Sequence, residues 1–376
     1  MQNSQTETYQ GPPYFVTLQS LRGIAIIIII IHNVRWVVPP LTFNFFKNGD
    51  LLVDFFFILS GFLIFNNDKF WIKNVHEFFN FIISKIYRLY PLHFLFLIVF
   101  LGIEFLKYFA ETQYGLVANS PAFSRNNLCT FISNIFLLQS FKFSNIVTFN
   151  GPSWFVSALF YTYISFGVIL LAIKNKKIYF LLSLIIVIIS TMILVFVSDT
   201  VTPSYKYAFF RGMNGFYLGI LTRIVFNYKL TDGKISSVLS GLMLLIILII
   251  MSMSGLGVKK ILILPVFMIL IWAAANLPYN ACISKLLTMS PLVKLGDISF
   301  SVLMCHFSIL WIYNQILSIL IEVPQHERLL YPTHSMGLIF LCLYIITVLV
   351  CSSFIYKYIE IPCRQYLVRR QFRSLL

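Results

Sequence analysis

The chain has 376 residues, of which 59% are hydrophobic and 11% are charged, with a net charge of +15. Soluble domains carry about 25% charged residues, so this composition excludes an ordinary soluble protein and indicates an α-helical membrane protein with several spans. The apolar runs are continuous rather than alternating, which disfavours a β-barrel, and the excess of basic residues is typical of cytoplasmic anchors rather than of nucleic-acid binding.

The apolar runs predict an all-α polytopic membrane protein with about ten transmembrane helices, because a span needs about 20 apolar residues. The segment at 128–140 is shorter and contains polar residues, so we expect it to be re-entrant or interfacial. The first run lacks a basic leader and a small-residue cleavage site, which favours a span over a signal peptide. The ten predicted spans cover residues 18–38, 49–66, 89–107, 152–173, 178–198, 207–226, 235–254, 258–277, 296–321 and 336–357.

The distribution of lysine and arginine predicts the orientation of these spans. With the N-terminus inside, 18 of the 28 basic residues lie on the cytoplasmic side and 10 lie on the other side. The positive-inside rule therefore favours a cytoplasmic location for both termini. We expect an N-terminal cytoplasmic tail at 1–15, a transmembrane domain at 16–358 and a basic cytoplasmic tail at 359–376.

The first apolar run holds two ionisable residues, Arg22 and His32. Such residues are costly in lipid and mark functional positions. An α-helix places the two roughly 15 Å apart along its axis, and ten steps at about 100° leave them roughly 80° from alignment. We expect Arg22 near one membrane surface and His32 near the midplane, on the catalytic helix.

Further along the chain, polar residues interrupt the second and third runs. Asp54 begins the second run as a capping or functional residue, and Ser60-Gly61 predicts a close approach by another helix. Lys85 and Arg88 are three residues apart on one face of the third helix. Such a pair suits phosphate oxygens, although the alternative reading is a positive-inside anchor. Pro91 suits the first turn of a helix.

The later runs add weaker signals. Trp154 and Tyr161 fit interface aromatics, which is their commonest role in membrane proteins. His306 lies about half-way along the ninth span, where a lone histidine is more often structural than functional. The six cysteines are scattered without a CxxC pair, so we expect neither a metal site nor disulfides.

Taken together and in this order, these segments resemble the acyltransferase 3 family of bacterial membrane O-acyltransferases. The resemblance covers about residues 15–365, and the second-helix and late segments are its most specific parts. It departs from the family in three places: nine residues rather than ten separate Arg22 from His32, Lys85 replaces an arginine, and WFVSALFY lacks the usual acidic residue. We expect no SGNH-type esterase-like domain. The segments that carry the resemblance are LRGIAIIIIIIH, VDFFFILSGFLI, KIYRLYP, RGMNGFYLG, PLVKLGDISFSVLMCHFSIL and the closing YIEIP.

The resemblance implies a multi-pass enzyme of the bacterial inner membrane that moves an acyl group, expected to be acetyl, from cytoplasmic acyl-CoA to a hydroxyl. The acceptor would be a cell-surface polysaccharide or its lipid-linked precursor, and the other partners would be the lipid bilayer and a homo-oligomeric copy. His32 would be the general base, and Arg22 would orient donor or base or stabilise the oxyanion. Lys85 and Arg88 would hold the CoA phosphates. Substrate binding or structural support would fall to Asp54, Trp154, Arg211, His306 and Glu360.

Two other classes of function stay open at this point. A transporter or flippase for a glycan or small solute explains the spans and the buried ionisable residues equally well, although the chain lacks the internal repeat of many transporters. A structural or partner-binding membrane protein predicts that all these polar residues tolerate substitution. Within the enzyme reading, direct transfer and a covalent acyl-histidine relay are both open.

Overall fold

The computed structural model describes residues 15–65, 72–116, 120–141, 147–198, 201–204, 206–226, 233–322 and 330–366. Over these ranges the chain is helical, and its extended pairing is an isolated bridge between Trp36 and Leu330. The predicted all-α class is therefore confirmed. The predicted N-terminal tail, apart from Phe15, and the last ten residues of the basic tail lie outside the described ranges.

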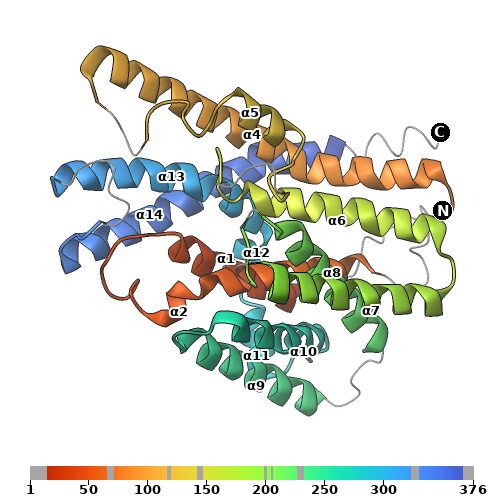
Figure 1. Ribbon diagram of the computed structural model, residues 1–376. Helices are drawn as coiled ribbons and strands as arrows, with labels where there is room; N and C mark the ends of the chain where they lie inside the picture. Colours follow the sequence, from red (N-terminus) through yellow and green to blue (C-terminus); the bar gives the residue numbers. More distant parts are fainter. Residues whose placement is uncertain are drawn as a thin grey trace, which may run out of the picture.

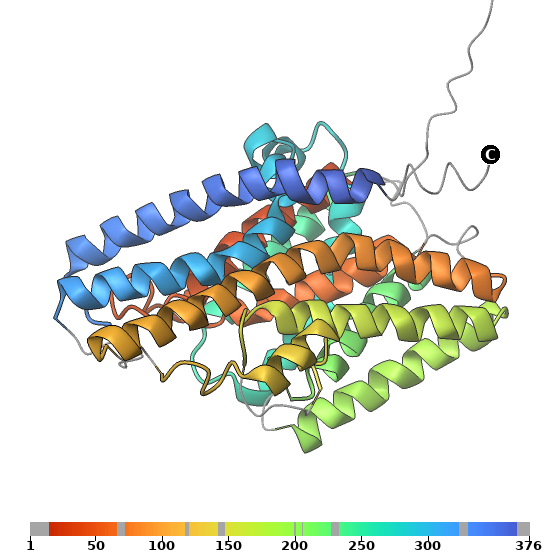
Figure 2. The same cartoon turned by 90° about the horizontal axis from the view of Figure 1, so that it is seen from above.

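The longer helices lie side by side along one common direction, as Figures 1 and 2 show from two sides. Short helical turns η1 to η4 join or extend them at Gly49–Leu51, Ile193–Val197, Gly257–Leu262 and Tyr356–Glu360. In chain order the helices are α1 Val16–His32, α2 Asn44–Lys47, α3 Leu52–Ile64, α4 Val75–Tyr114, α5 Leu128–Ile135, α6 Ser153–Ala172, α7 Lys176–Met192, α8 Ala208–Val225, α9 Gly233–Ser252, α10 Ile263–Ala275, α11 Cys282–Leu287, α12 Ser290–Asp297, α13 Ser299–Leu320 and α14 His334–Ile355.

Each of the ten apolar stretches coincides with a helix, but not all of these helices are long and apolar enough to span a bilayer. In the described ranges, seven segments are long and apolar enough: Val75–Tyr114, Ser153–Ala172, Lys176–Val197, Gly233–Ser252, Gly257–Ala275, Ser299–Leu320 and His334–Tyr366. By contrast α1 has 17 residues and α3 has 13, short of the usual 20. The count of ten spans and the orientation of the termini therefore stay predictions.

Two predicted helix boundaries are wrong. The first run leaves the helix at His32, and residues 33–38 follow a non-helical path in which the Val37 N–H donates to the carbonyl of Leu330 at 2.7 Å instead of to a helical partner. The third run belongs to a helix of 40 residues, so Pro91 lies inside α4 rather than in its first turn. This helix begins earlier because the side chain of Asn74 accepts a hydrogen bond from the backbone N–H of Glu77 and caps it.

The segment predicted to be re-entrant or interfacial forms α5, which has eight residues and is too short to cross a membrane. Asn127 caps its start by accepting from the backbone N–H of Thr130. Near the end of α5, the backbone carbonyl of the buried Asn134 accepts a hydrogen bond from Nε2 of His93 on α4 at 2.9 Å. This contact fixes α5 against the side of α4.

The closest helix pair is α3 with α8. A Cβ atom added at Gly61 of α3 would lie 1.8 Å from the carbonyl oxygen of Phe216, and one added at Gly219 of α8 would lie 1.9 Å from that of Ile58. Both distances are far below van der Waals contact, so only glycine permits this approach. The close approach predicted from Ser60-Gly61 is confirmed.

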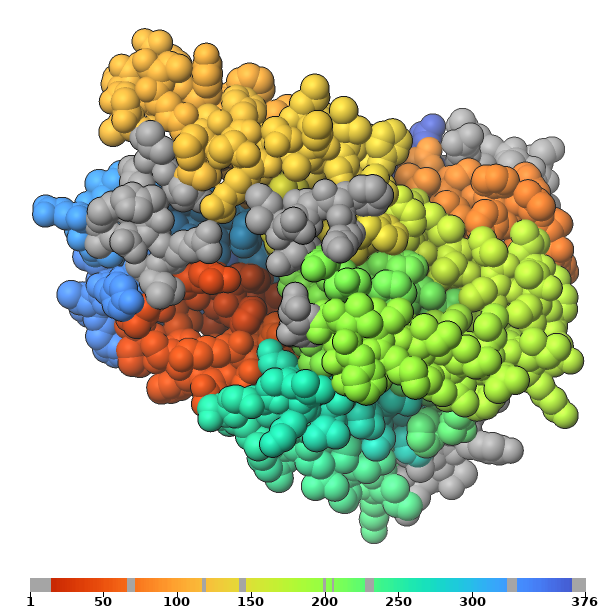
Figure 3. Space-filling model, in the orientation of Figure 1, coloured from red at the N-terminus to blue at the C-terminus, as the bar shows by residue number. Residues whose placement is uncertain are grey.

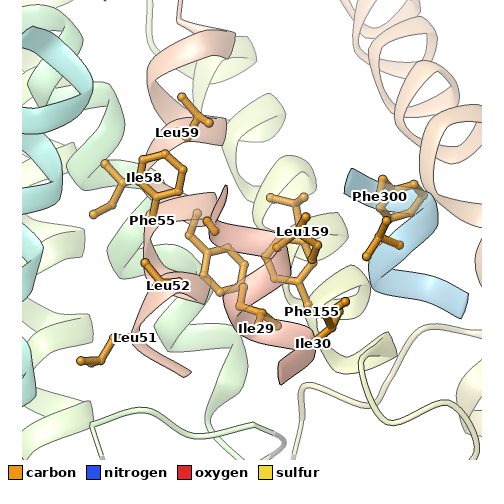
Figure 4. Close-up of a cluster of buried hydrophobic side chains, with 14 of the residues drawn as sticks. Ile29, Ile30, Leu51, Leu52, Phe55, Ile58, Leu59, Phe155, Leu159 and Phe300 are labelled. Atoms are coloured by element: carbon orange, nitrogen blue, oxygen red, sulfur yellow. The ribbon is translucent and has the colours of Figure 1, made fainter. Parts of the chain in front are cut away.

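Apolar side chains fill the space between these helices. Figure 4 shows Ile29 and Ile30 of α1 meeting Phe55 of α3 and Phe155 of α6 in one buried cluster, with Phe300 of α13 nearby. All five side chains are less than one-tenth exposed. The cluster holds the catalytic candidate α1 between α3, α6 and α13.

Candidate active site

His32 is the last residue of α1 and is partly exposed. Its Nδ1 lies 3.0 Å from the carbonyl oxygen of Phe46, in the last turn of α2. The ring packs so tightly on the following turn that a Cβ atom at Gly49 would lie 2.6 Å from the Cβ of His32. The short helix α2 and Gly49 therefore fix the orientation of this imidazole.

This contact assigns the tautomer of His32. A carbonyl oxygen only accepts hydrogen bonds, so Nδ1 carries the proton and donates it. Nε2 is then the nitrogen with the free lone pair, and no described residue hydrogen-bonds to it. A histidine held in this way is ready to accept a proton from a ligand.

The turn after Gly49 links His32 to a group of charged residues. Asp50 follows Gly49, which packs on His32, and its Oδ2 accepts a hydrogen bond from Lys260 at 2.8 Å. The backbone carbonyl of Asp50 accepts a second bond from Arg211 at 2.6 Å. Asp50, which sequence reasoning had not singled out, is thus the bridge between the histidine and two cations.

Asp54 and Arg211 form a buried ion pair across the contact between α3 and α8. Arg211 Nε donates to Asp54 Oδ1 at 2.8 Å, and Nη2 donates to Oδ2 at 3.0 Å. The guanidinium carbon lies 5.4 Å from the ring centroid of Trp154, at the start of α6. Both carboxylate oxygens of Asp54 thus pair with Arg211, and the chain reaches His32 through Gly49, next to Asp50.

The expectation that Trp154 faces the membrane interface is wrong. Its side chain is 9% exposed and packs on Phe57 and Phe155 as well as on Arg211. Phe56 and Phe57 of α3 place an aromatic surface opposite the start of α6, so the indole ring turns inward. Tyr161 is part-exposed, and its hydroxyl donates to the carbonyl of Phe136 at 3.0 Å.

His306 lies on α13 and is completely buried. Its Nδ1 faces the carbonyl oxygens of Val302 and Leu303 at 3.1 and 2.9 Å, and its Nε2 lies 3.3 Å from the amide nitrogen of Asn33. Both ring nitrogens therefore have partners, and the contact with Asn33 joins the end of α1 to α13.

Nearer the other end of α1, Arg22 reaches the start of α13. It donates to Gln19 at 2.7 Å and to the hydroxyl of Ser299 at 2.9 Å. Because α1 is a regular helix without a bulge, Arg22 stays roughly 15 Å from His32 along the axis. The two residues thus lie well apart on the helix, with His32 at its end and Arg22 nearly two turns from its start.

Several charged residues gather around Arg22. Arg88 of α4 and Arg364, just after η4, act on it electrostatically, as does Glu360. Glu360 is buried and accepts hydrogen bonds from Arg364 and from Ser301, the latter at 2.5 Å. Arg22, Arg88 and Arg364, with the nearby Lys85, form what we term the basic cluster.

The structure gives Lys85 and Arg88 different surroundings. Lys85 is partly buried, with its Nζ 4.8 Å from the ring centroid of Phe81 and 5.1 Å from that of Tyr163. Arg88 is exposed, so its guanidinium is accessible to a ligand. Lys85 is therefore the more enclosed member of the pair.

The site thus has two parts: a histidine with a free nitrogen beside balanced charges at one end of α1, and a group of cations nearer the other. Sequence reasoning missed Asp50, Lys260 and Arg364. Asp50 and Lys260 lie within the first three residues of two predicted spans, where charged residues are common, and the structure places them in the short turns η1 and η3. Arg364 was indistinguishable from the other cations of the basic tail.

A family model described as an acyltransferase domain matches residues 15–357 of the chain. No curated protein and no solved structure matches the chain.

Proposed function

Since the chain belongs to the acyltransferase 3 family and is a multi-pass membrane protein, we propose that it transfers an acetyl group from cytoplasmic acetyl-CoA to a hydroxyl of a glycan. The acceptor is a cell-surface polysaccharide or its lipid-linked precursor, and the site of action is the bacterial inner membrane. The observation that carries this proposal is the hydrogen bond from His32 Nδ1 to Phe46, which leaves Nε2 free as a base.

In the proposed reaction, the acceptor hydroxyl gives its proton to His32 Nε2 as its oxygen attacks the thioester carbonyl. The carbon–sulfur bond then breaks, and the protonated imidazole returns the proton to the leaving thiolate. The products are the O-acetyl ester and free CoA, so the histidine is unchanged at the end. Direct transfer needs no further reactant, and the bond to Phe46 keeps the ring in place throughout.

The basic cluster supports a donor that enters from the cytoplasmic side. Acetyl-CoA carries phosphates at one end and the thioester at the other, separated by a long flexible arm. Arginine binds phosphate oxygens through paired N–H groups, and Arg22, on which Arg88 acts, lies roughly 15 Å from His32 along α1. Phosphates bound there would leave the thioester end directed along α1 toward His32.

The proposal can be tested with purified protein in detergent by measuring the hydrolysis of acetyl-CoA, in which water takes the place of the acceptor hydroxyl and the products are acetate and CoA. Wild-type protein should release CoA, and His32→Ala should not. His32→Asn is the matched variant, because its side-chain amide can still donate to Phe46 but has no basic nitrogen. Release by His32→Asn at the wild-type rate would remove His32 from the chemistry, and no release by the wild type would contradict the donor.

A further inference from the structure

The hydrogen bond between His32 and Phe46 joins two stretches of chain that cannot hold it in place by themselves. His32 is the last residue of α1, and Phe46 lies in α2, a single turn of four residues, none of which is buried. A helix of this length is not stable alone. Contacts made by neighbouring residues must therefore fix both ends of this bond.

Asn33 holds the end of α1 against α13. It follows His32 directly, and its side-chain nitrogen donates to the backbone carbonyl of Ile29, one turn back, at 3.0 Å. The same nitrogen lies 3.3 Å from Nε2 of the buried His306. Because Nδ1 of His306 donates to backbone carbonyls of its own helix, Nε2 is the acceptor in this contact. The amide of Asn33 thus donates once within α1 and once to α13.

A second contact beyond Asn33 strengthens this attachment. Trp36 Nε1 donates to the side-chain oxygen of Asn314 on α13 at 2.8 Å, and its buried ring packs on Phe340 and Tyr344 of α14. In Figure 3 the stretch between α1 and η1 (red-orange) lies between α13 and α14 (blue) and the end of α9 with η3 (teal). The end of α1 is thus attached to α13 at two points, of which Asn33 is the one next to the histidine.

Asn48 holds α2 against the end of α9. It follows α2 directly, two residues after Phe46, and its side-chain nitrogen donates to the backbone carbonyls of Met251 and Met253, both at 2.9 Å. Carbonyls at the end of a helix lack partners within that helix, so Asn48 supplies donors where α9 needs them and is itself fixed there. The acceptor of the histidine bond is in this way tied to a helix of 20 residues.

We propose that Asn33 and Asn48 are positioning residues for the base. Asn33 fixes the backbone that carries His32, and Asn48 fixes the carbonyl of Phe46 that keeps the proton on Nδ1. The proposal rests on the proposed role of His32 and adds the residues that keep its Nε2 lone pair available. Without either amide, the ring loses its fixed orientation and also populates the tautomer protonated at Nε2, which cannot accept a proton there.

The test removes each amide and compares it with an asparagine that makes similar bonds elsewhere. Asn33→Leu is matched by Asn276→Leu, because Asn276 at the end of α10 also donates to the backbone carbonyl four residues back, at 2.8 Å. Asn48→Leu is matched by Asn175→Leu, because the side chain of Asn175 also makes two bonds to backbone, at the start of α7. Neither control residue contacts His32 or its partner Phe46.

Two measurements are made on each purified variant. Acetyl-CoA hydrolysis at varied acetyl-CoA concentration gives kcat and KM. NMR of the histidine nitrogens in isotope-labelled protein reports which nitrogen of His32 carries the proton, and the signals of His32 are those absent from His32→Ala. Asn33→Leu and Asn48→Leu should each lower kcat at least tenfold, keep KM within twofold of the wild type and move part of the His32 proton to Nε2. The two controls should change neither kcat nor the tautomer.

A kcat within twofold of the wild type, or a His32 proton that stays wholly on Nδ1, would overturn the role of the asparagine concerned. An equal loss of kcat in its matched control would overturn that role as well, because the effect would then be one of general stability.

Second variants cover the case in which a leucine variant does not fold. Asn48→Ala and His306→Leu remove the same contacts and have the same readouts, and His306→Gln, whose side-chain oxygen can accept from Asn33, should regain kcat relative to His306→Leu. A wild type that does not hydrolyse acetyl-CoA would contradict the proposed function itself, and the His32 signals would still decide whether the two asparagines position the ring.

Discussion

Asp54 on α3 and Arg211 on α8 are joined by two parallel hydrogen bonds, of 2.8 and 3.0 Å, inside the helix bundle. The pair lies at the same end of both helices, and three to four residues further along each helix Phe57 meets Gly215. The ion pair therefore fixes the register of α3 against α8 next to the candidate active site. Its charges are shielded from lipid by Trp154 and by the turn at Asp50.

Removing one partner of this ion pair should destabilise the protein strongly. Asp54→Ala or Arg211→Ala would leave an uncompensated buried charge, which costs about 3–5 kcal/mol. We expect each variant to unfold at a clearly lower temperature than the wild type in detergent. The double variant should lose less than the sum of the two single losses, and strict additivity would show that the pair does not act as a unit.

The glycine contacts between α3 and α8 provide a second prediction. Gly61→Ala must push the two helices apart, because its Cβ would lie 1.8 Å from a backbone oxygen that cannot rotate away. We expect a large loss of thermal stability, greater than that of a typical helix substitution. Gly102→Ala on α4 is the control, since no atom lies within 4 Å of its Cβ, and it should be neutral or slightly stabilising. Equal stability of the two variants would contradict the close packing.

The sequence was sufficient for the helical class, because the apolar runs are continuous, as in membrane helices, and do not alternate, as in the strands of a membrane barrel. It also located Gly61, since a small residue in an apolar helix has few roles besides close packing. It placed both His32 and Arg22 on one helix. The helices that carry Gly61, His32 and Arg22 could thus be predicted from the local sequence pattern alone.

The contacts of the site needed the structure. Asp54 could have faced His32, but the distant Arg211 takes both of its oxygens. Trp154 looked like an interface aromatic, because nothing local shows that α3 and α8 converge on it. Asp50 and Lys260 are 210 residues apart and meet only because the folded chain brings η3 next to η1. Such pairings depend on tertiary packing, which a single sequence does not encode locally.

The basic cluster leads to a kinetic prediction. Arg88→Ala should raise the KM for acetyl-CoA about tenfold or more and leave kcat nearly unchanged, because a phosphate contact serves binding rather than the chemical step. CoA release at varied acetyl-CoA concentration provides both constants. Lys285→Ala is the matched control, since Lys285 is an exposed cation outside the basic cluster. An unchanged KM in Arg88→Ala would make Arg88 a topology anchor.

The most direct test of the central claim is the O-acetyl content of purified surface polysaccharide, measured by NMR in a deletion strain restored with wild type, His32→Ala or His32→Asn. The account predicts that acetyl signals vanish on deletion and return with the wild type alone, although all three proteins are present in the membrane. Acetyl signals restored by His32→Asn would contradict a general base at this position. A polysaccharide that is absent from the surface after deletion would instead favour export over acyl transfer.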